Sequence, residues 1–408
     1  MLERNILMWL LASLFYAYQY ILRVIPNIIA SELIARFKVS ASDVGQFGGL
    51  YYIGYTIAHI PVGFFLDKYG PKFILPICTI FTFVGTLPLI CFDKWYYSII
   101  GRIVVGIGSS ASAVGIFKVA SMYFSREKSA RMASLSIIVG LLGAIYGGLP
   151  LNLLLNRFGW NYAIYTFSAF GFLLALLLFF VTPVDNTQQD LNSNIFQDLR
   201  TIFFNKNIIL ISVFSGLMIG PLEGFADGWV KVFLCESYQM SESLASSLSS
   251  LIFVGMGIGA FFLTFLLEKY SNRHYEIIII CSFGMIVSFF FLLFMRDGGI
   301  YVVLPALFII GFASGYQIVA IYKAISYVSN NLIGLAVAIS NMIIMVFGYF
   351  FHIGIAKIVD LYWNGTVIRG NPVYDAELLV RAISIIPVFL LLGGLGFVWL
   401  KQRSKNGF

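Results

Sequence analysis

The sequence has few charged residues: Asp, Glu, Lys and Arg together make up 11% of its 408 residues. A soluble domain carries about 25%, so the composition excludes an ordinary soluble protein. Hydrophobic residues account for 60% of the chain. The apolar runs are long enough for helices of about 20 residues, the length that crosses a bilayer, and the alternating pattern of an outer-membrane barrel is absent. An integral membrane protein made of helices is therefore predicted.

Residues that hold metals or form disulfides are also scarce. The four cysteines form no close pair, and the three histidines lie far apart in the sequence. We therefore expect no metal, no disulfide framework and no cofactor. The chain has no Walker motif and no nucleophile–base pair or paired catalytic carboxylates in a loop, so neither ATP hydrolysis nor an enzyme is expected. Its bases are scattered between apolar runs, which argues against nucleic acid as a partner.

Hydropathy predicts an all-α integral membrane fold with twelve transmembrane helices. Six of them precede a polar stretch and six follow it. The predicted spans lie near 6–29, 44–66, 73–92, 96–122, 133–154, 161–182, 208–234, 244–267, 276–295, 300–325, 332–356 and 379–400. We predict a six-helix bundle over 1–182, a cytoplasmic linker over 183–207 and a second bundle over 208–408. More Lys and Arg residues lie on the side of the membrane that carries the linker than on the other side. This excess predicts that both termini are cytoplasmic.

An internal repeat relates the two halves. Asp67-Lys68-Tyr69 recurs as Glu268-Lys269-Tyr270, and the run Gly106 to Ser121 aligns with Gly311 to Ser326. The offsets of 201 and 205 residues are nearly equal, so one six-helix unit has been duplicated into two pseudo-symmetric bundles.

The stretch from Gly63 to Lys72 contains an acid, two bases, two glycines and a proline within ten residues between two spans, and we expect a short, tightly turning loop there. It places Gly63, Asp67, Lys68, Gly70 and Lys72 at the spacing of the loop signature between helices 2 and 3 of the major facilitator superfamily. Arg102, Gly106 and Gly108 resemble that family's helix 4 signature. The chain thus resembles this superfamily over nearly its whole length, and the resemblance implies a transporter in which helices 1, 4, 7 and 10 line the substrate path.

The resemblance also implies a gate at the cytoplasmic ends of the two halves, in which Asp67 acts as a latch. The partners expected for Asp67 are Arg126, Arg131 and the helix start near Asn331. The predicted gating residues are Gly63, Asp67, Lys68, Gly70, Lys72, Arg126, Arg131, Glu268 and Arg273.

Softer matches are similar to the phagosomal transporters of intracellular bacteria, which carry amino acids or nucleosides, and more distantly to lysosomal dipeptide carriers. They include Phe15-Tyr16-Ala17-Tyr18, Ile60-Pro61-Val62-Gly63 and Phe225-Ala226-Asp227-Gly228-Trp229. This likeness implies a protein of the bacterial inner membrane.

Charges within the spans are the main candidates for the substrate site, because a charge at bilayer depth is costly and usually faces a cavity or a partner. Arg23, Arg102, Lys118 and Lys323 are basic, whereas Glu223 and Asp227 are acidic and spaced four residues apart, on one helix face. The predicted substrate-binding residues are Arg23, Tyr51, Tyr55, Arg102, Lys118, Glu223, Asp227, Gln317, Lys323 and Asn341. Other interpretations are hydration or pairing at the helix ends for Arg102, Asp227 and Lys231, and snorkelling to the cytoplasmic surface for Lys118 and Lys323.

These residues predict a secondary transporter of a small polar metabolite. A zwitterion fits both signs: Lys118 or Arg102 would hold a carboxylate, and Glu223 or Asp227 an amine or a coupling proton. We expect a monomer in the bilayer that carries an amino acid or short peptide, coupled to H⁺. An organic anion is the first alternative substrate, since four bases would make a positive cavity, and a nucleoside is the second.

Overall fold

The computed structural model describes residues 2–124, 126–183, 195–270, 272–329, 332–368, 371–372 and 374–405. They form helices, apart from two strands of two residues each, β1 and β2, which pair antiparallel. The chain divides into two compact units: Met1–Val39 with Leu50–Asn192, and Ser40–Gly49 with Ser193–Phe408. We call them the first and the second unit; our exact domain boundaries stay a prediction.

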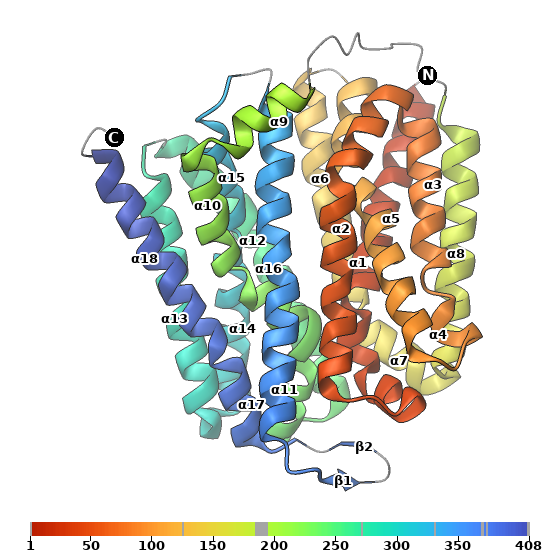
Figure 1. The fold of residues 1–408 in the computed structure, drawn as a ribbon, viewed down its shortest axis with the longest axis vertical. Coiled ribbons are helices and arrows are strands. Elements are labelled where there is room, and N and C mark those ends of the chain that lie inside the picture. Colours follow the sequence, from red (N-terminus) through yellow and green to blue (C-terminus); the bar gives the residue numbers. More distant parts are fainter. Residues whose placement is uncertain are drawn as a thin grey trace. The chain divides into compact units, whose positions relative to one another are not determined.

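The first unit contains eight helical segments among the described residues (Figure 1). They are α1 (Leu2–Phe37), α2 (Ala41–Tyr69), α3 (Pro71–Val84), α4 (Pro88–Cys91), α5 (Trp95–Tyr123), α6 (Arg126–Tyr146), α7 (Leu149–Phe158) and α8 (Trp160–Val181). The first residues of α2, up to Gly49, belong to the second unit.

The second unit begins with a helix inside the predicted linker. Its elements are α9 (Ile195–Phe203), α10 (Lys206–Leu217), the π-helix η1 (Pro221–Trp229), α11 (Val230–Tyr238), α12 (Glu242–Lys269), α13 (His274–Phe294), η2 (Arg296–Gly298), α14 (Ile300–Ser314), α15 (Tyr316–Ile325), α16 (Ile333–Tyr362), β1 (Val367–Ile368), β2 (Asn371–Pro372), α17 (Ala376–Ile383) and α18 (Ile385–Lys405).

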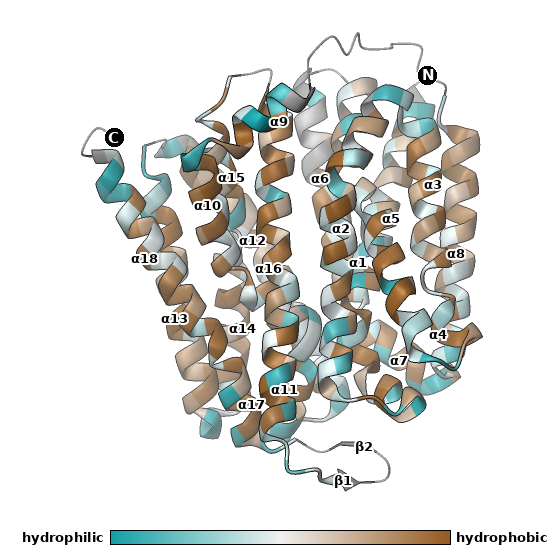
Figure 2. Cartoon of the chain, viewed as in Figure 1, coloured by the Kyte–Doolittle hydropathy of each residue, from teal (hydrophilic) through white to brown (hydrophobic). Residues whose placement is uncertain are grey.

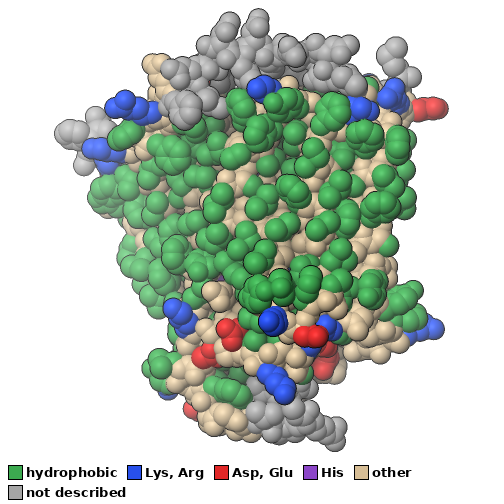
Figure 3. Space-filling view, turned by 45° about the vertical axis from the view of Figure 1, so that its right-hand side comes forward, with side chains coloured by type: hydrophobic (Ala, Val, Ile, Leu, Met, Phe, Trp, Pro, Cys, Tyr) green, Lys and Arg blue, Asp and Glu red, His purple; other side chains and the backbone are tan. Residues whose placement is uncertain are grey.

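The prediction of twelve membrane spans is confirmed. Among the described residues, eleven helical segments are long and apolar enough to cross a bilayer, and Leu135–Tyr146 with Leu149–Phe158, bent by 41°, makes a twelfth. Apolar residues occupy the middle of most helices and polar residues their ends (Figure 2). On the face shown in Figure 3, hydrophobic side chains cover the middle, and Lys, Arg, Asp and Glu side chains gather at the two ends. This distribution matches a bilayer between two aqueous phases.

Equivalent backbone contacts confirm the internal repeat. A Cβ atom on Gly106 would collide with the carbonyl oxygen of Tyr51, and one on Gly311 with that of Ile252. Tyr51 and Ile252 differ by the offset of 201 residues found for the second helices, and Gly106 and Gly311 by the offset of 205 found for the fourth. Each unit therefore joins its second and fourth spans by the same glycine contact, which lets two helices approach closely.

Several spans that we predicted as single helices are interrupted. The predicted spans 73–92, 133–154, 208–234 and 300–325 divide into α3 and α4, α6 and α7, α10 with η1 and α11, and α14 and α15. Glycines or prolines mark each break: Gly85 and Pro88, Gly147 and Gly148, Gly220 and Pro221, and Gly315. Proline removes a hydrogen-bond donor and glycine lowers helix propensity, so these residues weaken the helix at those points.

The prediction of a loop from Gly63 to Lys72 is wrong for most of its length. Helix α2 continues to Tyr69 and α3 begins at Pro71, so Gly70 alone lies between them. Gly70 makes the turn with φ 76° and ψ 170°, a conformation that is essentially restricted to glycine. The charged part of the motif is therefore the last turn of a helix.

We expect Gly70→Ala to destabilise the protein by about 1–3 kcal/mol, because the new Cβ makes this backbone conformation strained. Gly63→Ala is the matched control from the same motif, since a Cβ there would meet nothing within 4 Å. Thermal unfolding of both purified variants checks the difference. Equal unfolding temperatures for the two variants would contradict the assignment of the turn to Gly70.

Candidate functional site

Arg102 on α5 repairs a break in the hydrogen bonding of α1. Pro26 has no N–H, so the carbonyl of Leu22, four residues earlier, lacks its helical donor. Arg102 Nη1 donates to that oxygen at 2.6 Å, and Nη2 donates to the carbonyl of Arg23 at 2.9 Å. The Arg102 side chain is 4% exposed. Arg102 is therefore anchored to the α1 backbone by at least two of its donors, and this contact fixes the segment that carries Arg23.

Aromatic rings lie beside the guanidinium groups of Arg102 and Arg23 in the first unit. The Arg102 guanidinium lies 5.0 Å from the ring centre of Tyr51. That of Arg23 lies 4.9 Å from the Tyr20 ring and 5.8 Å from the Tyr52 ring. A ring face attracts a cation without neutralising it. These contacts place aromatic ring faces beside both positive charges.

Tyr51 and Tyr55 share one face of α2. Their rings stack at 6.1 Å, and His59 continues the column at 5.0 Å from Tyr55. The Tyr51 hydroxyl donates to Oε1 of Gln19 on α1 at 2.5 Å, and both side chains are buried. In this structure the hydrogen bond of Tyr51 joins α2 to α1, close to Arg102.

The predicted acidic residues lie in the π-helix η1. Gly220 and Pro221 interrupt the seventh span, and in η1 the Val230 N–H donates to the carbonyl of Phe225, five residues back. Glu223 and Asp227 are fully buried there. Short π-helical segments inside longer helices occur frequently at functional sites. The position of both carboxylates in this segment makes η1 the strongest candidate for function in the second unit.

Tyr316 at the start of α15 stabilises the break before η1. Its hydroxyl donates to the carbonyl of Ser215 at 2.6 Å, and Tyr316 interacts electrostatically with Glu223. Arg102 makes the corresponding contact in the first unit, since both side chains come from the fourth span of a half and donate to the backbone of its first span. In each half, a buried polar side chain of the fourth span thus donates to the backbone of the first span.

Helix α16 packs against η1 and α10 through a row of glycines spaced four residues apart: Gly216, Gly220, Gly224 and Gly228. A Cβ on Gly224 would lie 2.8 Å from Cβ of Phe351, and one on Gly228 would lie 2.8 Å from Cε1 of His352. His352 also fills the space beside Gly48, where a Cβ would lie 2.7 Å from Nδ1. The beginning of α2 and the acidic π-helix therefore meet the same imidazole.

The remaining predicted substrate residues lie in different environments. Gln317 is 9% exposed, and its Nε2 has no hydrogen-bond partner among the described residues. Asn341 and Lys118 are half-buried. Lys323 lies 4.8 Å from the Tyr327 ring centre and 5.3 Å from that of Tyr275, near the end of its span. This position agrees with the alternative that Lys323 snorkels, and its substrate role stays a prediction.

The structure describes the side chains of only some of the predicted gating residues. The side chains of Asp67, Arg126, Arg131 and Glu268, and the whole of Asn331, lie outside the described part of the structure. Lys72 donates to the carbonyls of Phe179 and Thr182 at 2.9 Å each and so caps the end of α8. Lys68 and Arg273 lie over aromatic rings. The gate stays a prediction.

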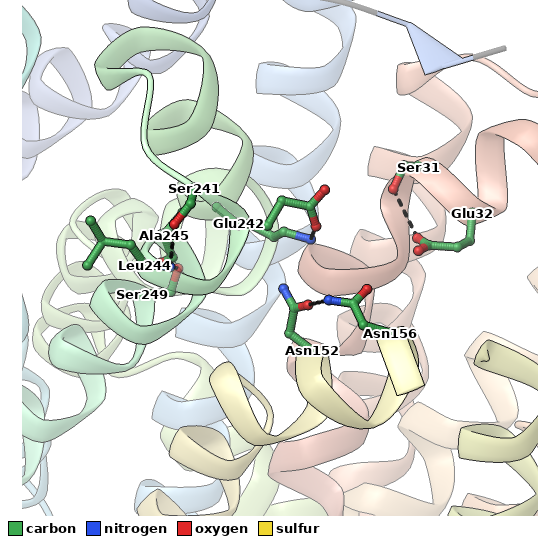
Figure 4. A network of polar contacts seen from close by, with 10 residues as sticks. Ser31, Glu32, Asn152, Asn156, Ser241, Glu242, Leu244, Ala245 and Ser249 are labelled. Atoms are coloured by element: carbon green, nitrogen blue, oxygen red, sulfur yellow. Dashed lines mark hydrogen bonds and ion pairs between the residues drawn. The ribbon is translucent and has the colours of Figure 1, made fainter. Parts of the chain in front are cut away.

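Sequence reasoning missed Gln19 and Tyr316. Pro26 signals a carbonyl in need of a donor only at Leu22, which Arg102 bonds. Lys231 on α11 pairs with Glu242 on α12, whose Oε2 lies 2.9 Å from Nζ. This agrees with the alternative that Lys231 is paired at its helix end, although the sequence did not identify the partner. Figure 4 shows Glu242 beside Ser241, which caps α12 by accepting the Leu244 N–H at 3.4 Å. In the first unit it shows Asn156 donating to Asn152 at 2.7 Å.

The chain matches known membrane transporters in sequence and in fold. A family model described as Major Facilitator Superfamily matches residues 8–351. The nitrate/nitrite transporter NrtP of Picosynechococcus sp. is 29% identical over 149 residues, which are 36% of this chain and 24% of NrtP. The uncharacterised transporter YybO of Bacillus subtilis is 23% identical over 314 residues, covering 70% of this chain and 71% of YybO.

Among solved structures, a bacterial homologue of the human lysosomal transporter Spinster, in an inward-facing and unoccupied conformation, aligns with a TM-score of 0.75. The alignment covers 97% of this chain and 96% of that one at 17% identity. At this identity the likeness concerns the fold alone.

Proposed function

Because this chain belongs to the Major Facilitator Superfamily, a family of membrane transporters, we propose that it moves an amino acid or a short peptide across the membrane by alternating access. The observation that carries the substrate class is the burial of both signs of charge. Arg23 and Arg102 lie buried in the first unit, and Glu223 and Asp227 lie buried in the second. A zwitterionic substrate requires both.

We assign the substrate carboxylate to Arg23 rather than to Arg102. Arg102 already donates to two backbone carbonyls, so its role is to position α1. The guanidinium of Arg23 lies against the rings of Tyr20 and Tyr52, and a planar fork of donors suits a carboxylate.

Proton coupling is proposed for Glu223 and Asp227. Acidic side chains within membrane spans often belong to proton relays, and both of these carboxylates are fully buried in the seventh span. The proposal places the driving proton in η1, where both acids lie. We further propose a monomer in a bacterial inner membrane with both termini cytoplasmic, similar in substrate to the phagosomal transporters.

The test has two steps. A thermal-shift screen of the purified full chain against amino acids, dipeptides, organic anions and nucleosides identifies a stabilising compound, and we expect an amino acid or a dipeptide. Counterflow and pH-driven uptake of that compound are then measured in proteoliposomes. Glu223→Gln should abolish acceleration by an inward proton gradient but retain counterflow, because exchange needs no net proton movement. Wild-type uptake that ignores the gradient would overturn the coupling, and stabilisation only by dicarboxylates would overturn the substrate class.

An organic anion is the second candidate. The two buried guanidinium groups of the first unit favour it, and NrtP, similar over part of the chain, is named as a nitrate/nitrite transporter. Replacing Glu223 and Asp227 with their amides separates the two proposals: binding of an amino acid should weaken, whereas binding of a simple anion should persist or strengthen.

A further inference from the structure

One end of the second unit carries a rim of basic side chains linked by aromatic rings. We define the basic rim as Arg200, Lys206, Lys323, Lys401 and Arg403. Asn205, next to Lys206, donates to the carbonyl of Tyr327 at 3.3 Å, and the Tyr327 hydroxyl lies 3.2 Å from that of Tyr275. Lys323 lies over both rings. These contacts tie the α9–α10 corner to the start of α13.

The rim continues onto α18. The Tyr275 ring lies 6.4 Å from that of Phe397, and Lys401 pairs with Glu276 of α13, with 3.0 Å between Nζ and Oε1. The Trp399 ring lies 6.4 Å from that of Phe214 on α10. The first turn of α10 and the last turns of α18 therefore lie at the same end of the unit, as Figure 1 also shows.

The charge of the rim is not neutralised within the described residues. Glu276 engages Lys401, but Arg200, Lys206, Lys323 and Arg403 have neither an ion pair nor a hydrogen bond from their charged groups to any residue that the structure describes. Arg200 lies over Phe204 at 5.7 Å, and Arg403 over Trp399 at 5.5 Å. Lys72, in the first turn of α3 in the first unit, differs because two carbonyls hold its ammonium group.

Exposed apolar side chains continue from the rim along α18. Trp399 is 47% exposed, and Val388, Leu391 and Leu395 are 55%, 52% and 55% exposed. On α9 and just after it, Phe203 and Phe204 are 43% and 75% exposed, while Ile202 is buried. An amphipathic helix with exposed aromatic residues beside bases is typical of a membrane–water interface. The surface thus combines cations at headgroup level with an apolar face at acyl-chain level.

We propose that the basic rim binds an anionic phospholipid, with its phosphate against Lys206 and Arg403 and its acyl chains along the apolar face of α18. Basic clusters beside membrane helices attract anionic headgroups by about 1 kcal/mol for each Lys or Arg, which corresponds to about five-fold in affinity. The ring contacts hold the side chains of Arg200, Lys323 and Arg403 in place without neutralising their charge. This inference is independent of the transported substrate.

Native mass spectrometry of the purified full chain, exposed to equal amounts of phosphatidylglycerol and phosphatidylcholine, tests the proposal. We expect the wild type to retain phosphatidylglycerol selectively. Lys206→Gln and Arg403→Gln should each reduce this retention about five-fold. The matched control is Arg381→Gln, because Arg381 also stacks on a ring, that of Tyr362 at 4.5 Å, but lies on α17, near the start of the last span and at the opposite end of that span from Arg403.

A salt titration of the wild type keeps the test independent of variant folding, because screening should release phosphatidylglycerol and spare phosphatidylcholine. Inorganic phosphate distinguishes a lipid site from a simple anion site, and we expect millimolar phosphate to leave the lipid bound. Equal retention of both lipids by the wild type, equal loss in the control and the rim variants, or full displacement by phosphate would each overturn the proposal.

Discussion

Replacing Arg102 with alanine is expected to abolish transport and to destabilise the protein by about 3 kcal/mol or more, since hydrogen bonds from a charged donor contribute about 1.5–3 kcal/mol each. The variant loses the donors to the carbonyls of Leu22 and Arg23. The Leu22 oxygen then has no donor from its own helix, because Pro26 supplies none. Thermal unfolding and counterflow of the compound identified in the screen measure the two effects.

Arg102→Lys is informative because an ammonium group cannot present the planar fork that reaches two adjacent carbonyls. We expect it to recover part of the stability and little of the transport, as Arg23 would no longer be held in place. Arg157→Ala is the control, because Arg157 is exposed and stacks only on Phe158, at 5.3 Å, among described residues. A wild-type unfolding temperature for Arg102→Ala would show that the carbonyl contacts do not stabilise α1.

Alanine at Gly106 or at Gly311 should disrupt the unit that contains it. In each case the new Cβ collides with a backbone carbonyl, of Tyr51 or of Ile252, and a backbone atom cannot rotate away as a side chain can. The two helices must therefore separate, and overpacking of this kind costs about 1–3 kcal/mol. We expect each variant to yield much less monodisperse protein by size exclusion and to unfold at a lower temperature.

Gly334→Ala on α16 provides the control, because a Cβ there meets nothing within 4 Å. The internal repeat adds a second requirement: Gly106→Ala and Gly311→Ala should be similar in severity, since they occupy equivalent contacts. A tolerated Gly311→Ala beside a disruptive Gly106→Ala would mean that the two halves no longer use this contact in the same way.

The membrane fold could be predicted because hydropathy and the repeat depend on many residues at once. The repeat aligns Asp67 with Glu268 and Gly106 with Gly311. It thereby matches α2 to α12 and α5 to α14, and the glycine contacts join α2 to α5 and α12 to α14. The interruptions could not be placed in the same way. Gly220 and Pro221 signal a weak point in the seventh span, but a π-helix from Pro221 to Trp229 depends on packing against α16.

The candidate site was predictable in its residue types and less so in their roles. The cost of burying a charge pointed to Arg102 and Glu223, yet it could not distinguish a substrate ligand from a side chain that repairs a helix. That distinction required the position of the Leu22 carbonyl relative to Arg102. Tyr316 was missed because its role depends on the carbonyl of Ser215, which is distant in the sequence.

The glycine row of α10 and η1 has a mechanical consequence for α16. Side chains such as Phe351 and His352 rest on backbone at Gly224 and Gly228, where the glycines have no side chain to block them. Side chains on both helices resist sliding along the helix axis, and the glycine row lowers that resistance. Because the glycines recur every four residues, a shift by about one helical turn would bring Phe351 or His352 from one glycine to the next. The contact is thus close in distance and smooth along its length.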